Sequence, residues 1–349
     1  MEEITLISLL ELLALGTATF LGIHFLSLKE KSKQLLGYFL LLGFTMDFIY
    51  RAAFSLGVEI SFDYLPQMSF IYIPFLYYYA LQLTGQEMKG KWNLLIPSVV
   101  FYIAHLAAIY FDTEWYFVFE HLCTYLFSIY ISILILQVIK KHQSNLLDYF
   151  SSIEYKGLKW LQKLTLILLL FNVLWMVEDA IYVFTDWEIF LAEVSAVATF
   201  VTVYWIGFSS LKQAVIFEEV VKSTEVELPR TLNQLETELY NKLISSMNED
   251  ALYKNENISL RELATQLNTS DKLLSKVINI ETKNNFYHFI NSYRIQNFKV
   301  AILNNRYPNL TQFGVAQECG FKTKSTFYSA FKKLHGCTPK EFVQSFKSE

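Results

Sequence analysis

The chain has 349 residues, of which 53% are hydrophobic and 18% are charged. Soluble domains contain fewer hydrophobic and more charged residues, so this composition argues against an entirely soluble protein. The charge is divided unevenly: residues 1–239 carry 14 Lys and Arg against 24 Asp and Glu, a net of −10, whereas residues 240–349 carry 15 against 9, a net of +6. A basic C-terminal region is expected where one part of a protein meets a polyanion.

Seven long apolar segments occupy the first 211 residues. A helix needs about 20 mostly apolar residues to cross a bilayer, and each segment reaches that length. The first begins Met1-Glu2-Glu3 without a basic residue, so we interpret it as a retained helix and not as a cleaved signal peptide. The sequence therefore predicts an all-α protein whose residues 1–211 form a seven-helix transmembrane domain. The predicted spans are 4–28, 34–56, 65–84, 92–111, 115–139, 158–184 and 187–211.

The connections between these segments alternate in their content of basic residues. Lysines occur in the connections 29–33, 85–91 and 140–163, whereas neither Lys nor Arg occurs in 57–64, 112–114 and 185–186. Because basic loops stay in the cytoplasm, this pattern predicts an N-terminus outside the cell. Everything after residue 211 is then cytoplasmic, and the expected location is the cytoplasmic (inner) membrane of a bacterium, with the lipid bilayer as one partner.

Ionisable residues inside the predicted spans form a candidate ligand pocket. By the predicted topology they lie in the outer half of the membrane, where such groups usually pair or face a wet cavity. Two interpretations stay open: a pocket for a small cationic ligand or metal ion, or groups that bond one another and fix helix packing. The candidate residues are Asp47, Arg51, His105, Glu120, His121, Glu178, Asp179 and Glu193, with Glu11 in the same half.

Metals and cofactors are not expected. No HxxxH or comparable ligand spacing occurs in the spans, so a metal site has little support. The three cysteines, Cys123, Cys319 and Cys337, include no CxxC pair, which argues against a structural zinc site and against a disulfide framework.

Residues 212–236 are polar and acidic, and Pro229 interrupts any helix there. We expect a helix that continues the seventh span to about Thr224, followed by a short linker. This segment either transmits a movement from the membrane or serves as an inert spacer, and the sequence does not distinguish the two.

A first helix-turn-helix is predicted at residues 259–280. Ser259 and Glu262 have capping-box spacing, Asn268 and Thr269 form the turn, and Ser270 caps the second helix. Apolar residues of that helix are expected to face inward: Leu273, Leu274, Val277 and Ile278. Its outward residues are predicted to be Asp271, Lys272, Ser275, Lys276 and Asn279.

The same pattern recurs at residues 311–333, after a long predicted helix from Phe286 to Leu303. Thr311 caps the first helix, Gly320 supplies the turn with Phe321 packed beneath it, and Thr323 caps the second helix. Residues expected to face inward are Phe327, Ala330, Phe331 and Leu334. Residues expected to face outward are Lys322, Lys324, Ser325, Thr326, Ser329, Lys332 and Lys333.

Residues 240–346 resemble the DNA-binding domain of AraC/XylS-type transcriptional regulators. The resemblance rests on SLRELATQLNTSDKLLSKVIN at 259–279, FYHFINSYRIQNFKVAIL at 286–303 and, most specifically, VAQECGFKTKSTFYSAFKKLHGCTPKEF at 315–342. It implies a soluble seven-helix domain, which we place at 237–349. Its two recognition helices would enter successive major grooves of double-stranded DNA, about 34 Å apart.

The resemblance also implies which side chains meet DNA. Base-edge contacts would come from Asp271, Lys272, Lys276, Lys324, Ser325 and Ser329, and phosphate contacts from Lys322, Lys332 and Lys333. Many family members carry Arg where this chain has Lys276 and Ser329. Because Lys and Ser lack the planar fork with which Arg binds guanine in a bidentate manner, we expect weak direct readout by the second unit.

Together the two halves predict a membrane-bound, one-component transcriptional regulator that is not an enzyme. The usual soluble sugar-binding barrel of the family is absent, and the chain is similar to membrane-bound variants found in some bacteria. One alternative is a transporter, channel or membrane enzyme with a regulatory tail, but neither spans broken by paired Gly and Pro nor a catalytic constellation is visible. Another is a protein-interaction adaptor, against which the basic charge of residues 240–349 argues. Homodimer formation and contact with RNA polymerase stay open.

Overall fold

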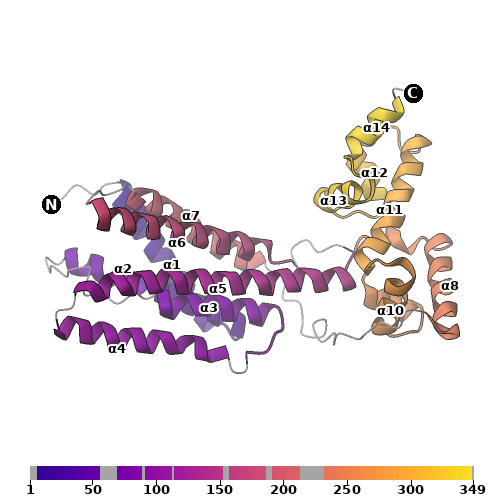
Figure 1. Ribbon diagram of the computed structural model, residues 1–349. Coiled ribbons are helices and arrows are strands. Elements are labelled where there is room, and N and C mark those ends of the chain that lie inside the picture. Colours follow the sequence, from indigo (N-terminus) through magenta and orange to yellow (C-terminus); the bar gives the residue numbers. More distant parts are fainter. Residues whose placement is uncertain are drawn as a thin grey trace. The chain divides into compact units, whose positions relative to one another are not determined.

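Helices make up nearly all the regular structure of the described residues. The computed structural model describes residues 6–55, 69–88, 91–111, 114–151, 157–185, 191–212 and 232–347 (Figure 1). Within these ranges the one bridge between extended residues is antiparallel and joins Phe150 to Ser259. The chain divides into two units: the first comprises residues 1–140 and 158–218, and the second comprises 141–157 and 219–349.

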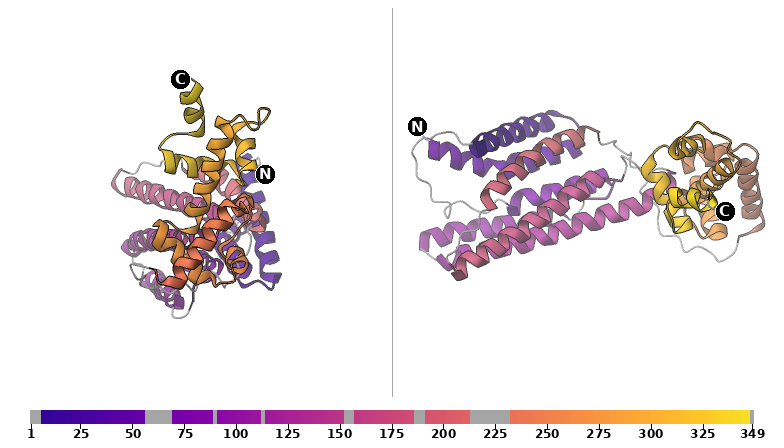
Figure 2. Two further views of the ribbon diagram at one scale, coloured as in Figure 1. Left: turned by 90° about the vertical axis from the view of Figure 1, so that its right-hand side faces the viewer. Right: turned by 90° about the horizontal axis from the view of Figure 1, so that it is seen from above.

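The first unit follows the predicted apolar segments closely. Its helices run roughly along one common direction (Figures 1 and 2), and α1 packs against α2 and α7. Within the described ranges its α-helices are α1 (Leu6–Ser27), α2 (Lys31–Ser55), α3 (Ser69–Leu83), α4 (Ile96–Phe111), α5 (Glu114–Tyr149), α6 (Lys159–Thr185) and α7 (Leu191–Lys212). A short 3₁₀ turn, η2 (Lys91–Leu95), precedes α4.

Helix α5 runs past the predicted end of its apolar segment at residue 139. It continues through the polar residues 140–149, because that stretch contains neither Pro nor Gly to end it. Its last residues belong to the second unit.

Three helices within the described ranges are long and apolar enough to cross a membrane: Trp92–Phe111, Val118–Tyr149 and Lys159–Ile181. Shorter apolar helices cover Leu12–Ser27, Phe70–Leu83 and Val197–Ser210. The structure therefore supports a membrane protein. Of the seven spans predicted from the sequence, it shows three helices of full span length among the described residues.

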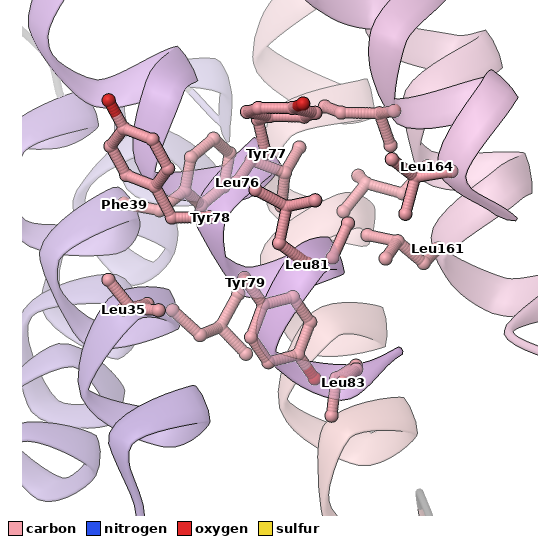
Figure 3. Close-up of a cluster of buried hydrophobic side chains, with 14 of the residues drawn as sticks. Leu35, Phe39, Leu76, Tyr77, Tyr78, Tyr79, Leu81, Leu83, Leu161 and Leu164 are labelled. Carbon is pink, nitrogen blue, oxygen red and sulfur yellow. The ribbon is translucent and has the colours of Figure 1, made fainter. Parts of the chain in front are cut away.

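The interior of the first unit is aromatic and aliphatic. Tyr77, Tyr78 and Tyr79 of α3 lie buried among leucines of α2 and α6 (Figure 3). Helices α1 and α2 approach closely at two glycines, since a Cβ at Gly37 would lie 2.9 Å from the carbonyl oxygen of Gly22. Small residues at such crossings are typical of helices that associate in a membrane.

The second unit contains seven α-helices between residues 232 and 347, the number that the resemblance implies. They are α8 (Gln234–Asn248), α9 (Leu260–Gln266), α10 (Asp271–Thr282), α11 (Phe286–Leu303), α12 (Gln312–Glu318), α13 (Lys324–His335) and α14 (Pro339–Lys347), with a 3₁₀ turn, η4 (Leu252–Lys254). Helix α11 lies between the α8–α10 group and the α12–α14 group (Figure 1). Its first half packs in one core with Leu263 and Leu274, and its second half packs in the other with Phe321 and Phe327.

The predicted helix starts in this unit are confirmed at each cap. Ser259 and Glu262 form a capping box at α9. The side chains of Ser270, Thr311 and Thr323 each accept a backbone N–H at the start of α10, α12 and α13. Gly320 forms the second turn with a φ of +98°.

Two predicted side-chain positions on α13 are wrong. Thr326 was predicted to face outward but is only 7% exposed, because its hydroxyl accepts a hydrogen bond from that of Thr323 at 3.0 Å. Leu334 was predicted to face inward but is 48% exposed, because it lies in the last turn of α13, beyond the buried Ala330 and Phe331. The helix predicted up to Thr224 lies outside the described residues apart from its start at Lys212.

Candidate DNA-binding surface

The second helix of the first helix-turn-helix, α10, carries polar residues opposite its buried side. Leu274, Val277 and Ile278 are buried, and Lys272 is exposed. The predicted contact residues Asp271, Ser275 and Asn279 are partly exposed, and an Asp271 carboxylate oxygen accepts the backbone N–H of Lys272 at 2.9 Å. The helix therefore has a polar side that includes its N-terminal turn.

Lys276 is engaged within the protein. Its Nζ donates to Oε1 of Glu236 on α8 at 2.6 Å, and the two side chains are 24% and 6% exposed. Glu236 also accepts the backbone N–H of Asn233 in a second capping box, which the sequence analysis missed. The hydrogen bond from Lys276, together with that from Asn233, lowers the pKa of Glu236 and keeps it ionised. The Asn-x-x-Glu spacing at 233–236 was a signal that could have found this cap.

The second helix of the second unit, α13, is more open. Lys324, Ser325 and Ser329 are exposed, as are Lys332 and Lys333. The Lys324 ammonium lies 5.5 Å from the centre of the Tyr328 ring, a cation–π arrangement that leaves its charge at the surface. Thr326 belongs to the interior instead.

Two surface lysines link parts of the domain. Lys322 donates to Oδ1 of Asn257 at 2.7 Å, which ties the second turn to the loop before α9. Lys333 donates to Nε2 of His288 on α11 at 2.6 Å. Burial and the nearby Lys333 lower the pKa of His288, so the imidazole stays neutral and able to accept.

The two helix-turn-helix units meet around Arg294 of α11, which is 1% exposed. Its Nε donates to the carbonyl of Tyr253 at 2.7 Å, and one Nη donates to the carbonyl of Asn255 at 2.8 Å. Its guanidinium lies 5.7 Å from the centre of the Phe321 ring in the second unit. Burial lowers the pKa of Arg294 to about 10, so it remains charged at neutral pH and depends on these acceptors.

Gly320 allows the units to approach at the same place. A Cβ there would lie 2.6 Å from the carbonyl oxygen of Tyr253 and 2.8 Å from Cα of Lys254. Close packing at Gly320 and the bonds of Arg294 join the turn of the second helix-turn-helix to the η4 region before α9.

Four of the candidate pocket residues of the first unit form two pairs. Within the span region, His105 Nδ1 lies 2.7 Å from Oε2 of the buried Glu120, and His121 Nδ1 lies 3.0 Å from Oδ2 of Asp179. The hydroxyl of Tyr125 donates to the same Asp179 oxygen at 2.8 Å.

Glu178 is partly exposed. The side chains of Glu11, Asp47, Arg51 and Glu193 lie outside those described. Among the described residues there is no group of three or more His, Cys, Asp and Glu that could hold a metal ion.

A cavity of about 230 Å³ lies among α2, α3, α5, α6 and α7 of the first unit. Its walls are largely aromatic and aliphatic, with Phe39, Tyr72, Phe171 and Trp175 among them. The polar residues at its walls are neutral: Thr124, Tyr125, Asn172, Thr199 and Thr202. None of the predicted ionisable pocket residues lines it, and Tyr125 connects it to the His121–Asp179 pair.

Comparison with known proteins identifies the second unit. Residues 263–345 match the model of a family described as a helix-turn-helix domain. In the same comparisons, no curated protein and no solved structure matched the chain. The matched residues include the first helix-turn-helix from Leu263 onward, all of the second, the α11 helix between them and nearly all of α14. The chain therefore contains a C-terminal helix-turn-helix domain of the AraC type.

Proposed function

We propose that this protein is a membrane-bound, one-component regulator of transcription. The observation that carries the proposal is a basic tandem helix-turn-helix domain in one chain with three helices of membrane-span length. Domains of this type are typical of regulators that bind DNA and do not catalyse reactions. A membrane domain attached to such a domain supports signal reception and DNA binding within one molecule.

In this proposal the DNA contacts come from α10 and α13. The exposed Lys272, Lys324, Ser325 and Ser329 contact base edges, with Asp271, Ser275 and Asn279 beside them. Lys322, Lys332 and Lys333 contact phosphates, which set affinity and not sequence choice. Lys276 contributes only when it leaves Glu236, and Thr326 contributes through packing.

The proposed topology has seven spans within residues 1–211, with the N-terminus outside. Its support is the alternation of lysine-rich and lysine-free connections, together with the helices found at the predicted segments. It leaves the second unit in the bacterial cytoplasm, where chromosomal DNA is available.

The sensing site that we propose is the cavity lined by Tyr125, Asn172 and Thr202. Because His121 and Tyr125 both bond Asp179, the nearby carboxylate is compensated. The cavity therefore favours a small neutral ligand with an apolar body and one or two hydrogen-bonding groups over a cation.

Recovery of DNA from living cells tests DNA binding and cytoplasmic placement together. The full-length chain, tagged at its C-terminus and cross-linked in intact bacteria, should enrich a small set of chromosomal fragments. Those fragments should carry paired half-sites about 10 bp apart. Failure to enrich any fragment over a chain lacking residues 232–349 would refute the proposal.

Binding of an enriched fragment by the full-length chain in lipid nanodiscs tests the contacts. Affinity should fall steeply with salt, because each neutralised phosphate releases counterions. The pair Lys322→Ala and Lys324→Ala should weaken binding about tenfold or more and reduce the salt slope by about 0.9, because only Lys322 is assigned to a phosphate. Lys340→Ala on α14, also an exposed lysine of this domain, is the matched control and should change neither. If the double variant binds like the control, the assigned contacts are wrong.

A further inference from the structure

The connection between α5 and α6 contributes a piece of the DNA-binding unit. Residues 141–157 comprise the last turns of α5 and the start of its connection to α6, yet they group with residues 219–349. Phe150 forms an antiparallel bridge with Ser259, which caps α9. Tyr149 packs against the core formed by α8, α9, α10 and the first half of α11.

Ser151 is the centre of this contact and is only 1% exposed. Its hydroxyl donates to the carbonyl of Ile258 at 2.8 Å, and its carbonyl accepts from Nδ2 of Asn291 at 3.2 Å. Its hydroxyl oxygen also accepts from Nη2 of Arg294 at 3.3 Å. These partners are 107, 140 and 143 positions away in sequence, so the contact is entirely tertiary.

The same Arg294 holds the two helix-turn-helix units together. It donates to the carbonyls of Tyr253 and Asn255 and lies against Phe321. Ser151 therefore supplies one of the acceptors that a buried guanidinium needs at the junction between the units. Replacing Ser151 with Ala removes one acceptor of Arg294 at the junction between the two helix-turn-helix units.

We infer that residues 149–151 are an internal docking segment, and that its seating on α9 and α11 holds the two recognition helices in the arrangement that binds DNA. The inference rests on the proposed DNA binding of this domain. Two recognition helices bind two half-sites with high affinity only if their spacing is fixed beforehand. A seated segment raises DNA affinity, and a released segment lowers it.

This arrangement gives the membrane domain a covalent route to the DNA-binding domain besides the connection after α7. Helix α5 carries Thr124 and Tyr125 at the cavity and ends at Tyr149 in the docking segment. A ligand that shifts α5 would change the seating of Phe150 and Ser151.

A disulfide across the bridge tests the docking. Paired residues of an antiparallel bridge lie about 4.5–5.5 Å apart at Cα, within the range that a disulfide spans. In the full-length chain in nanodiscs, Phe150→Cys with Ser259→Cys should form this disulfide on mild oxidation, mapped by mass spectrometry. If the disulfide does not form in a protein that still binds the enriched fragment, the docking is contradicted.

The effect on DNA binding is tested with Ser151→Ala. We expect affinity for the enriched fragment to fall about tenfold, equivalent to about 1.4 kcal/mol. Ser144→Ala, an exposed serine on the same stretch of α5, is the matched control and should bind as the wild type does. Closing the 150–259 disulfide in the Ser151→Ala chain should restore affinity, measured against the same protein after reduction.

The remaining outcomes separate this inference from the proposed function. If the disulfide forms but Ser151→Ala binds DNA like Ser144→Ala, the segment docks without controlling DNA binding, and the inference fails. If the wild-type chain enriches no fragment, the proposed function is wrong, and so is the inference that the docking segment regulates DNA binding. The disulfide then still decides whether the segment docks.

Discussion

At the scale of single residues, charged side chains of this DNA-binding domain are held by specific partners. Glu236 receives Lys276 and the backbone of Asn233, and these bonds lower its pKa below the ordinary value of 4.5. A carboxylate with a lowered pKa stabilises the fold above that ordinary value and loses its contribution as the pH falls through the lowered pKa. The Lys276–Glu236 pair is therefore intact at neutral pH.

Glu236→Gln should increase the affinity of the full-length chain for DNA. Gln can keep the capping-box hydrogen bond to Asn233, but it lacks the charge that holds Lys276, so an ammonium on α10 is released. We expect tighter binding to duplex DNA and a salt slope steeper by about 0.9, for one added phosphate contact. Binding titrations at several salt concentrations measure both quantities.

Glu238→Gln is the control, because Glu238 is exposed on the same helix and has the same charge. Equal affinities for the two variants would show that Lys276 does not reach DNA even when Glu236 no longer holds it.

At the scale of elements, the domain depends on α11 and on the turn that meets it. Helix α11 places Phe289 and Ile290 in one core and Ile295 and Phe298 in the other. One helix thus supports both helix-turn-helix units. The second unit approaches η4 closely where Gly320 meets the backbone of Tyr253 and Lys254.

Gly320→Ala should destabilise the domain more than Gly336→Ala. Both glycines have positive φ, +98° and +73°, so both substitutions introduce backbone strain of about 1–2 kcal/mol. Only at Gly320 would the new Cβ also collide with backbone, 2.6 Å from the Tyr253 carbonyl oxygen, whereas at Gly336 nothing lies within 4 Å. Overpacking of this kind adds about 1–3 kcal/mol.

Hydrogen exchange of α11 and α12 amides in the full-length chain measures this difference as a fall in opening free energy. Tryptophan fluorescence would not report on this domain, because all six tryptophans precede residue 232. Similar losses for the two variants would mean that the approach of the turn to η4 contributes little.

At the scale of the whole molecule, sensing and DNA binding are assigned to different units of one chain. The first unit holds a cavity with neutral polar groups, and the second holds the matched helix-turn-helix domain. If the cavity receives the signal, filling it should remove the response without impairing DNA binding itself.

Ala198→Phe places a bulky side chain in the cavity wall on α7 and should abolish changes in transcription from an enriched promoter across growth conditions. Val201→Phe is the matched control, since Val201 lies on the same helix and is 57% exposed. A reporter gene behind that promoter measures the response, and nanodisc titrations check that DNA affinity is retained. A response that survives Ala198→Phe as well as Val201→Phe would contradict sensing at the cavity.

The sequence by itself determined the local structure of this protein. Apolar segments of span length correspond to α1–α7, and the caps Ser259, Ser270, Thr311 and Thr323 begin their helices as predicted. These features depend on neighbours within a few residues, which a sequence displays directly. The charge of residues 240–349 indicated a polyanionic partner, and the family resemblance carried by the motif at 315–342 implied DNA binding.

Only the tertiary structure decided which polar groups bond within the protein and which remain available to bind DNA or a ligand. It pairs Lys276 with Glu236, turns Thr326 inward, compensates Asp179 with His121 and Tyr125, and seats Ser151 beside Arg294. Each of these contacts except that of Thr326 joins residues at least 40 positions apart. A buried charged or polar group needs a hydrogen-bond partner, and folding can supply that partner from a distant part of the sequence. The spacing of residues along the chain does not show which distant groups will meet.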